Sequence, residues 1–200
     1  MSDPLTPKVE SDASMYTADL RLDDEPTIEQ VAALLVEGFA AHYPKAYPDL
    51  IAALEEVRES FEGGRISRIA LDENGRVVGW ISGIPQYRGR VWELHPLVVS
   101  VHHQGQGIGR ALVADLEAQV KKRGGLTITL GTDDEDDQTT LAGINLFPNV
   151  FEHVAHIRNL RRHPYEFYQK QGYLIVGVIP DANGLGKPDI LMAKSVAREA

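Results

Sequence analysis

The sequence contains no cysteine, which excludes disulfide bonds, thiolate metal ligands and a cysteine nucleophile. A chain without disulfides is compatible with the reducing cytoplasm, and we expect the protein there. No run of residues approaches the roughly 20 apolar residues that span a bilayer, and the N-terminal segment lacks the apolar core of a signal peptide. We therefore expect no membrane partner.

Basic residues are in the minority. There are 20 Lys and Arg against 29 Asp and Glu, which gives a formal net charge of −9. A polyanion would be repelled at long range, so we expect no nucleic-acid partner. An acidic protein favours cationic partners such as amines, although the same charge also keeps a protein soluble.

The length and composition fit one compact domain. Two hundred residues with 43% hydrophobic content are enough to bury a core. The first residues are polar and include two prolines, so we expect a disordered arm at 1–14 and a single domain at 15–200.

Changes in hydrophobic periodicity predict the order β-α-α-β-β-β-α-β-α-β-β, which is a mixed α+β architecture. A capping box of Thr27 and Gln30 predicts the start of the first helix, and Pro48 that of the second. Pro96 interrupts a long strand and predicts either a bulge or an edge position. The expected strands cover residues 16–22, 66–71, 77–84, 91–101, 126–131, 173–179 and 189–195. The expected inward helix residues are Ile28, Val31, Leu35, Phe39, Ile51, Leu54, Val57, Phe61, Leu112, Leu116 and Val120.

A glycine-rich segment lies between the long strand and the helix expected at 107–123. Residues 104–109 read Gln-Gly-Gln-Gly-Ile-Gly. Glycines let backbone N–H groups approach an anion closely, and a helix N-terminus adds about half a positive charge. The spacing is neither the G-x-G-x-x-G of dinucleotide-binding folds nor the Walker pattern. The segment predicts a pyrophosphate site, or else a tight turn that happens to be rich in glycine.

The spacing Gln-x-x-Gly-x-Gly resembles the acyl-CoA loop of the GNAT superfamily of N-acetyltransferases. The resemblance implies the GNAT fold, a mixed central sheet flanked by helices on both faces, with acetyl-CoA as cosubstrate. It also implies that the pantetheine arm of the cosubstrate pairs with the preceding strand like an added strand. The cofactor-binding residues that it implies are Val99, Val101, Gln104, Gly105, Gln106, Gly107, Ile108, Gly109 and Arg110.

Acetyl transfer to an amine needs a proton acceptor. An alkylamine with a lysine-like pKa is neutral to only about one part in 10³ at pH 7. Glu93 lies on the same strand upstream of Pro96, and the family has a base in this region. We predict that Glu93 is the general base, acting through water, or a ligand of the substrate amine. A solvated strand carboxylate is the alternative, and His95 is a weaker candidate.

Residues 163–173 resemble the second cofactor segment of the family, which ends in Tyr-x-Lys-x-Gly-Phe/Tyr. Tyr168 matches the tyrosine that the family has near the thioester sulfur. A phenol with an ordinary pKa of about 10 stays protonated at pH 7. The resemblance therefore implies that Tyr168 is the general acid for the departing thiolate.

Five consecutive carboxylates, residues 133–137, follow the strand after the cofactor helix. Such a run is typical of a solvated loop, but a polycation would offset the mutual repulsion of these charges. The strings at 92–99, 130–135, 163–168 and 183–190 occur in the order found in one group of aminoglycoside 6'-N-acetyltransferases, and the resemblance covers about residues 77–196.

This second resemblance implies an antibiotic-modifying, resistance-type enzyme that acetylates the 6'-amine by direct transfer in a ternary complex. The implied substrate-binding carboxylates are Glu93, Asp134 with its neighbour Asp133, and Asp189. It further implies a homodimer in which residues 138–162 help to shape the site. Three other interpretations remain: acetylation of a polyamine, acetylation of a protein N-terminus, or a non-catalytic acyl-CoA-binding module. No metal is implied, since His153 and His156 have no visible third ligand.

Overall fold

The computed structural model describes residues 15–198, so the disordered arm predicted at 1–14 lies outside the described residues. Seven strands form one sheet in the order β1-β2-β3-β4-β5-β7-β6. Neighbouring strands are antiparallel, except that β4 and β5 are parallel. The strands are β1 (Tyr16–Asp19), β2 (Ile66–Leu71), β3 (Val77–Gln86), β4 (Val91–Val99), β5 (Thr127–Asp133), β6 (Leu174–Ile179) and β7 (Asp189–Ser195).

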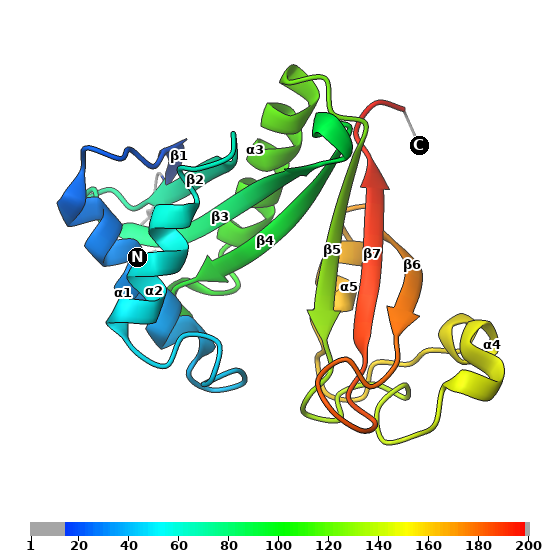
Figure 1. Ribbon diagram of the computed structural model, residues 1–200. Coiled ribbons are helices and arrows are strands. Elements are labelled where there is room, and N and C mark those ends of the chain that lie inside the picture. Colours follow the sequence, from blue (N-terminus) through cyan, green and yellow to red (C-terminus); the bar gives the residue numbers. More distant parts are fainter. Residues whose placement is uncertain (1–14, 199–200) are drawn as a thin grey trace, which may run out of the picture.

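Helices cover both faces of this sheet, which confirms the predicted α+β class (Figure 1). The helices α1 and α2 lie on one face of the β1–β4 half and α3 lies on its other face, while α5 lies on the α3 side of the sheet, behind β5 and β7. The helices are α1 (Glu25–Phe39), α2 (Leu50–Glu59), α3 (Ile108–Lys122), α4 (Val150–Ala155) and α5 (Tyr165–Gln169). Within residues 15–198, no helix is long and apolar enough to cross a membrane.

Each face of the sheet has its own hydrophobic cluster. Trp80 and Val98 pack with α1 and α2, whereas Trp92 and Leu94 pack with α3 and α5. Most of the predicted inward positions are confirmed, because Ile28, Val31, Leu35, Leu112, Leu116 and Val120 are fully buried. Ile51 is the exception, with 70% of its surface exposed.

The predicted starts of the first two helices were wrong. Asp24 caps α1, and its carboxylate accepts a hydrogen bond from the backbone N–H of Thr27. The capping box therefore misplaced the start, because an aspartate three residues earlier satisfies the same free N–H groups. Asp49 caps α2 in the same way, with one carboxylate oxygen accepting from two backbone N–H groups, so Pro48 precedes the helix.

The bulge predicted at Pro96 is confirmed, on a central strand. The register of β3 with β4 shifts so that His95 and Pro96 stand opposite the single residue Ser82. Proline has no N–H for the ladder, and an extra residue reverses which side chains face which side. Before the bulge Leu94 faces α3, and after it Val98 faces α1 and α2.

The pairing between β4 and β5 is short. Only Val91–Glu93 pairs with Thr127–Thr129, although β4 continues to Val99 and β5 to Asp133. The two strands diverge beyond this point (Figure 1). Within the described residues, no strand pairs with β4 on its β5 side after Glu93.

Candidate active site

The glycine-rich segment forms the start of α3. Gly105 and Gly107 have positive φ angles of 78° and 85°, and Gly107 is the N-cap residue of the helix. No side chain caps this end, so the first N–H groups of a 15-residue helix lack helical partners there. Free N–H groups and the helix dipole together suit a pyrophosphate. The backbone geometry therefore fits the predicted loop.

Gly109 brings α5 close to this loop. A Cβ atom at Gly109 would lie 3.1 Å from the ring of Phe167 and 3.6 Å from the side chain of Val99. The absence of a side chain therefore allows the start of α3, the end of β4 and α5 to meet. Tyr168 follows Phe167 on α5, so the predicted acid lies near the predicted pyrophosphate loop.

The predicted pantetheine contacts differ in their surroundings. Val99 is the last residue of β4, and its strand partner is Gly79 on the β3 side. Within the described residues no strand pairs with β4 on the β5 side of Val99, which is the edge predicted to pair with the pantetheine arm. Val101 is not in the strand, because a 3-10 turn spans Val101–His103. Both contacts stay predictions.

Glu93 lies on the sheet face opposite α3, between the two inward residues Trp92 and Leu94. It is the last residue of β4 that pairs with β5, so it marks the point where the strands diverge. Gln86 donates a side-chain hydrogen bond of 3.3 Å to the Glu93 carboxylate. The other carboxylate oxygen has no side-chain partner among the described hydrogen bonds.

Asp189 shares this face with Glu93 and begins β7 beside Asp133 of β5. Its carboxylate lies against Gly131, since a Cβ atom there would be 2.8 Å from Oδ1. The Oδ1 atom is buried and has no hydrogen-bond partner within residues 15–198. Burial, followed by the charges of Asp133 and Glu93, raises the pKa of Asp189 to about 6. A backbone hydrogen bond from Thr132 lowers this pKa only in part. A half-buried carboxylate with one oxygen free of partners suits a cationic ligand.

The acidic run does not form one uniform surface. Asp133 is half-buried at the end of β5, and its carboxylate accepts a hydrogen bond from the side chain of Asn183. Asp134 is fully buried, and its two oxygens accept backbone N–H bonds from Gln138 (2.7 Å) and Thr139 (2.8 Å). Asp134 therefore builds the loop, and this geometry favours an indirect effect on a substrate over direct contact. Its predicted role in binding stays untested.

Tyr168 is almost fully buried on α5, with 9% of its surface exposed. Its ring packs edge-on against Phe167, with centroids 5.0 Å apart, and against Tyr173 at 5.8 Å. Burial raises the pKa of the Tyr168 phenol above its ordinary value. The hydroxyl therefore remains protonated at neutral pH, as a proton donor must.

One carbonyl at the edge of this site receives two side-chain donors that sequence reasoning missed. The Asp133 carbonyl oxygen accepts from the Tyr43 hydroxyl at 2.7 Å and from His163 Nε2 at 3.0 Å. His163 Nδ1 accepts from the backbone N–H of Tyr165, so the proton of the neutral ring is on Nε2. Burial lowers the pKa of His163, which keeps the ring neutral.

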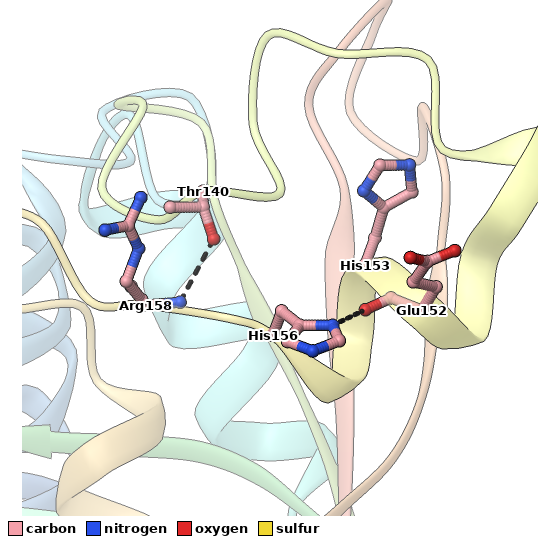
Figure 2. Close-up of a pocket in the computed structure, with 5 residues that line it drawn as sticks. All are labelled: Thr140, Glu152, His153, His156 and Arg158. Carbon is pink, nitrogen blue, oxygen red and sulfur yellow. Dashed lines mark hydrogen bonds between the residues drawn. The ribbon is translucent and has the colours of Figure 1, made fainter.

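A cavity of about 390 Å³ lies away from these groups, on the long connection around α4. It is lined by Thr140, Glu152, His153, His156 and Arg158 (Figure 2). The rings of His153 and His156 point in different directions, and His156 contacts the carbonyl of Glu152. Across residues 15–198, no group of three His, Asp or Glu side chains is arranged to hold a metal ion.

Comparison with known proteins gives a family and a set of similar structures. The model of the acetyltransferase (GNAT) family matches residues 28–147. A sequence search of curated proteins found no match.

Three crystal structures of antibiotic-modifying enzymes are similar to this chain over nearly its full length. An aminoglycoside 6'-N-acetyltransferase complexed with coenzyme A has 44% identity and a TM-score of 0.85, and the match covers 92% of this chain and 99% of that chain. The aminoglycoside 6'-N-acetyltransferase from Enterococcus faecium has 43% identity and a TM-score of 0.83 at the same coverage. An aminoglycoside 6'-acetyltransferase type Ii has 36% identity and a TM-score of 0.69, again over 92% and 99%.

Proposed function

The chain belongs to the GNAT acetyltransferase family, and from this premise we propose that it transfers the acetyl group of acetyl-CoA to the 6'-amine of aminoglycosides. Acetyl-CoA is the cosubstrate of the family, and a similar enzyme was crystallised with coenzyme A. The acceptor follows from 36–44% identity to three aminoglycoside 6'-acetyltransferases. Such an activity would inactivate the antibiotic.

The main structural support for an aminoglycoside as the acceptor is a group of carboxylates on one face of the sheet. Glu93, Asp133 and Asp189 lie where β4 and β5 diverge, and the charges of Glu93 and Asp133 both raise the pKa of Asp189. A carboxylate such as Asp189, which has two like charges beside it, gains from a ligand with several positive charges. Aminoglycosides carry several ammonium groups on a rigid scaffold.

Glu93 is the proposed base in a direct transfer within a ternary complex. Its carboxylate, acting through water, accepts a proton from the acceptor ammonium, and the neutral amine then attacks the thioester carbonyl carbon. The nitrogen loses its second proton to solvent as the amide forms. A C–N bond forms as the C–S bond breaks. Asp189 and Asp133 hold the remaining cationic groups, and Asp134 supports them by maintaining the loop that follows β5.

Tyr168 is the proposed general acid for the departing coenzyme A sulfur. It belongs to the cluster on the α3 side, whereas Glu93 faces the opposite side of the sheet. A protonated phenol gives its proton to the departing coenzyme A sulfur and regains one from solvent. The N–H groups at residues 105–110 would bind the pyrophosphate, and the free edge of β4 near Val99 and Val101 the pantetheine arm.

We also propose that residues 15–200 form a single domain, that two copies of the chain form a homodimer, and that the protein is in the cytoplasm. Three apolar side chains of the edge strand β6 are exposed, namely Leu174, Val176 and Ile179, and a second copy would cover such a surface. Light scattering after size exclusion checks this part, and a mass of one chain contradicts it. The cytoplasmic location rests on the cysteine-free sequence.

The decisive experiment is an acceptor assay with purified protein and acetyl-CoA. Kanamycin and tobramycin, which have a 6'-amine, should be acetylated, whereas paromomycin, which has a 6'-hydroxyl, should not be acetylated at that position. Mass spectrometry and NMR of the product identify the modified nitrogen. Turnover on spermidine or peptides with no turnover on any aminoglycoside would reject the proposed acceptor, and no turnover on any amine would favour a binding module.

A further inference from the structure

The loop between α1 and α2, residues 40–49, reaches the end of β5 although some 90 residues separate them in sequence. The Tyr43 hydroxyl donates to the Asp133 carbonyl at 2.7 Å, and His42 Nδ1 lies 2.8 Å from a carboxylate oxygen of Asp136. In Figure 1 this loop extends at the bottom of the view from α2 toward the end of β5. The loop therefore connects the two halves of the molecule at the end where β4 and β5 are not paired.

This loop is anchored on its own side. Tyr47 is buried in the cluster under α1 and α2, and its ring packs edge-on against Phe39 with centroids 4.9 Å apart. The backbone N–H of Tyr43 donates to the carbonyl of Phe39 at 2.8 Å. The loop is thus held in place against α1, and from it the Tyr43 hydroxyl donates to the Asp133 carbonyl.

Tyr43 also lies within the field of the acidic run. Burial is the main cause that raises the pKa of its phenol, followed by the charges of Asp133, Asp136, Glu135 and Asp134. The phenol therefore stays protonated and keeps donating to the Asp133 carbonyl. The same carbonyl accepts from His163, so the end of β5 is held from both sides.

We infer that Tyr43 is a positioning residue for the acceptor amine, because its hydroxyl fixes the end of β5 and thereby the carboxylates of Asp133 and the adjacent Asp189. The inference rests on the proposed function and extends it to a residue that lies outside residues 77–196, the part of the sequence that resembles aminoglycoside 6'-N-acetyltransferases. Tyr43 acts through Asp133 and takes no part in proton transfer. Within residues 15–198, Tyr43 makes hydrogen bonds to Phe39, Ala46 and Asp133 and none to residues 104–110, so we expect that binding of acetyl-CoA does not depend on it.

Tyr43→Phe removes only the hydroxyl and tests this role. We expect the KM for kanamycin to rise about fivefold, the factor that corresponds to one ordinary hydrogen bond. The kcat and the KM for acetyl-CoA should stay within about twofold of the parent enzyme. Tyr47→Phe is the matched control, because it removes a phenol oxygen from the same loop that has no hydrogen bond to β5, and it should leave all three values unchanged. Equal losses in kcat and both KM values in Tyr43→Phe would overturn the inference.

Hydrogen–deuterium exchange gives a readout that does not depend on the acceptor. In Tyr43→Phe, exchange should increase both at residues 40–46 and at residues 133–138, while α3 stays protected. Tyr47→Phe should not produce this paired increase. Unchanged exchange at 133–138 in Tyr43→Phe would overturn the positioning role even if kanamycin is a substrate. Conversely, a paired increase in an enzyme that ignores aminoglycosides would support the positioning role and reject the proposed acceptor, and the KM comparison would then be made with the amine that is acetylated.

Discussion

The carboxylate of Asp189 lies against the backbone of Gly131, so closely that a Cβ atom at position 131 would lie 3.0 Å from its Cγ and nearer still to its oxygens. Glycine at this point of β5 therefore leaves the space that the Asp189 carboxylate fills. The two residues belong to adjacent strands on the face that carries Glu93. The placement of the Asp189 carboxylate thus depends on the lack of a side chain at Gly131.

Gly131→Ala should displace the Asp189 carboxylate and weaken acceptor binding. We expect the kcat/KM for kanamycin to fall about tenfold, which corresponds to roughly 1.4 kcal/mol, with an unchanged KM for acetyl-CoA. Gly177→Ala is the matched control, because an added Cβ would meet only Leu191 at an ordinary 3.9 Å. Steady-state kinetics of both variants check the expectation, and equal behaviour would contradict it.

Asp189 should make stability depend on pH in the acidic range. Its folded pKa of about 6 is higher than the ordinary 3.8, so the folded protein holds this proton more tightly than the unfolded chain. The stabilising effect of protonation is present below about pH 4 and is lost as the pH rises through about 6. Compared with Asp189→Asn, the parent protein should therefore lose relative Tm over this window in thermal melts. If the Tm of the parent protein and that of Asp189→Asn change in parallel with pH, the pKa of Asp189 is not raised in the folded protein.

Gly107→Ala should weaken the binding of acetyl-CoA. The φ angle of 85° is strained for any residue with a side chain, at a cost of about 1–2 kcal/mol, and relaxation would turn the N–H groups away from the pyrophosphate. Calorimetric titration should give a Kd raised at least about tenfold. Gly75→Ala imposes a similar strain at φ 74° in the turn between β2 and β3, and its Kd should not change.

Tyr168→Phe should lower turnover more than affinity. Loss of a general acid typically reduces the rate by about 10²-fold or more, whereas the buried ring keeps its packing. We expect the kcat to fall by at least about tenfold while the Kd for acetyl-CoA changes little. Tyr173→Phe removes a buried hydroxyl from the neighbouring ring and serves as the control. An unchanged kcat in Tyr168→Phe rejects the acid role.

Asp134→Asn should lower the stability of the protein more than it impairs catalysis. Both carboxylate oxygens accept backbone N–H groups, and an amide would turn its own NH₂ toward one of them. The free energy of unfolding should fall by about 2 kcal/mol in urea denaturation. Asp137→Asn, which alters only an exposed pair with Lys187, should cost far less. A stable Asp134→Asn variant with a raised kanamycin KM would instead place this carboxylate in contact with the drug.

Local signals explain why much of the fold could be predicted. A hairpin around a loop rich in Gly, Pro and Asn predicted the bounds of β7 at 189–195, and the prolines and glycines predicted the bulge in β4 and the start of α3. These features depend on a few neighbouring residues, so the sequence contains the necessary information. Helix starts were less accurate because Asp24 and Thr27 are both good caps, and only the structure shows which one is used.

The arrangement of the site could not be derived in the same way. Five carboxylates in a row look alike in sequence, yet Asp134 is buried while Glu135 and Asp136 are exposed, because the backbone of the loop needs an acceptor at one position. Tyr43 carried no signal at all, since its partner lies 90 residues away. Contacts of this range depend on the packing of whole elements, which periodicity does not report.

At the bulge in β4, His95 and Pro96 stand opposite one residue of β3, and the side chains before and after the bulge therefore alternate in opposite order between the two faces of the sheet. Upstream of the bulge, Glu93 lies on the face opposite α3; downstream of it, Leu97 and Val99 lie on the α3 face and pack against its cluster. Removing one residue at the bulge would exchange the faces of Glu93 and Trp92, so that an indole would take the place of the carboxylate on the face that also has Asp189. A single additional amino acid therefore lets one continuous strand present a carboxylate on one face at its start and pack against α3 with the same alternate positions at its end.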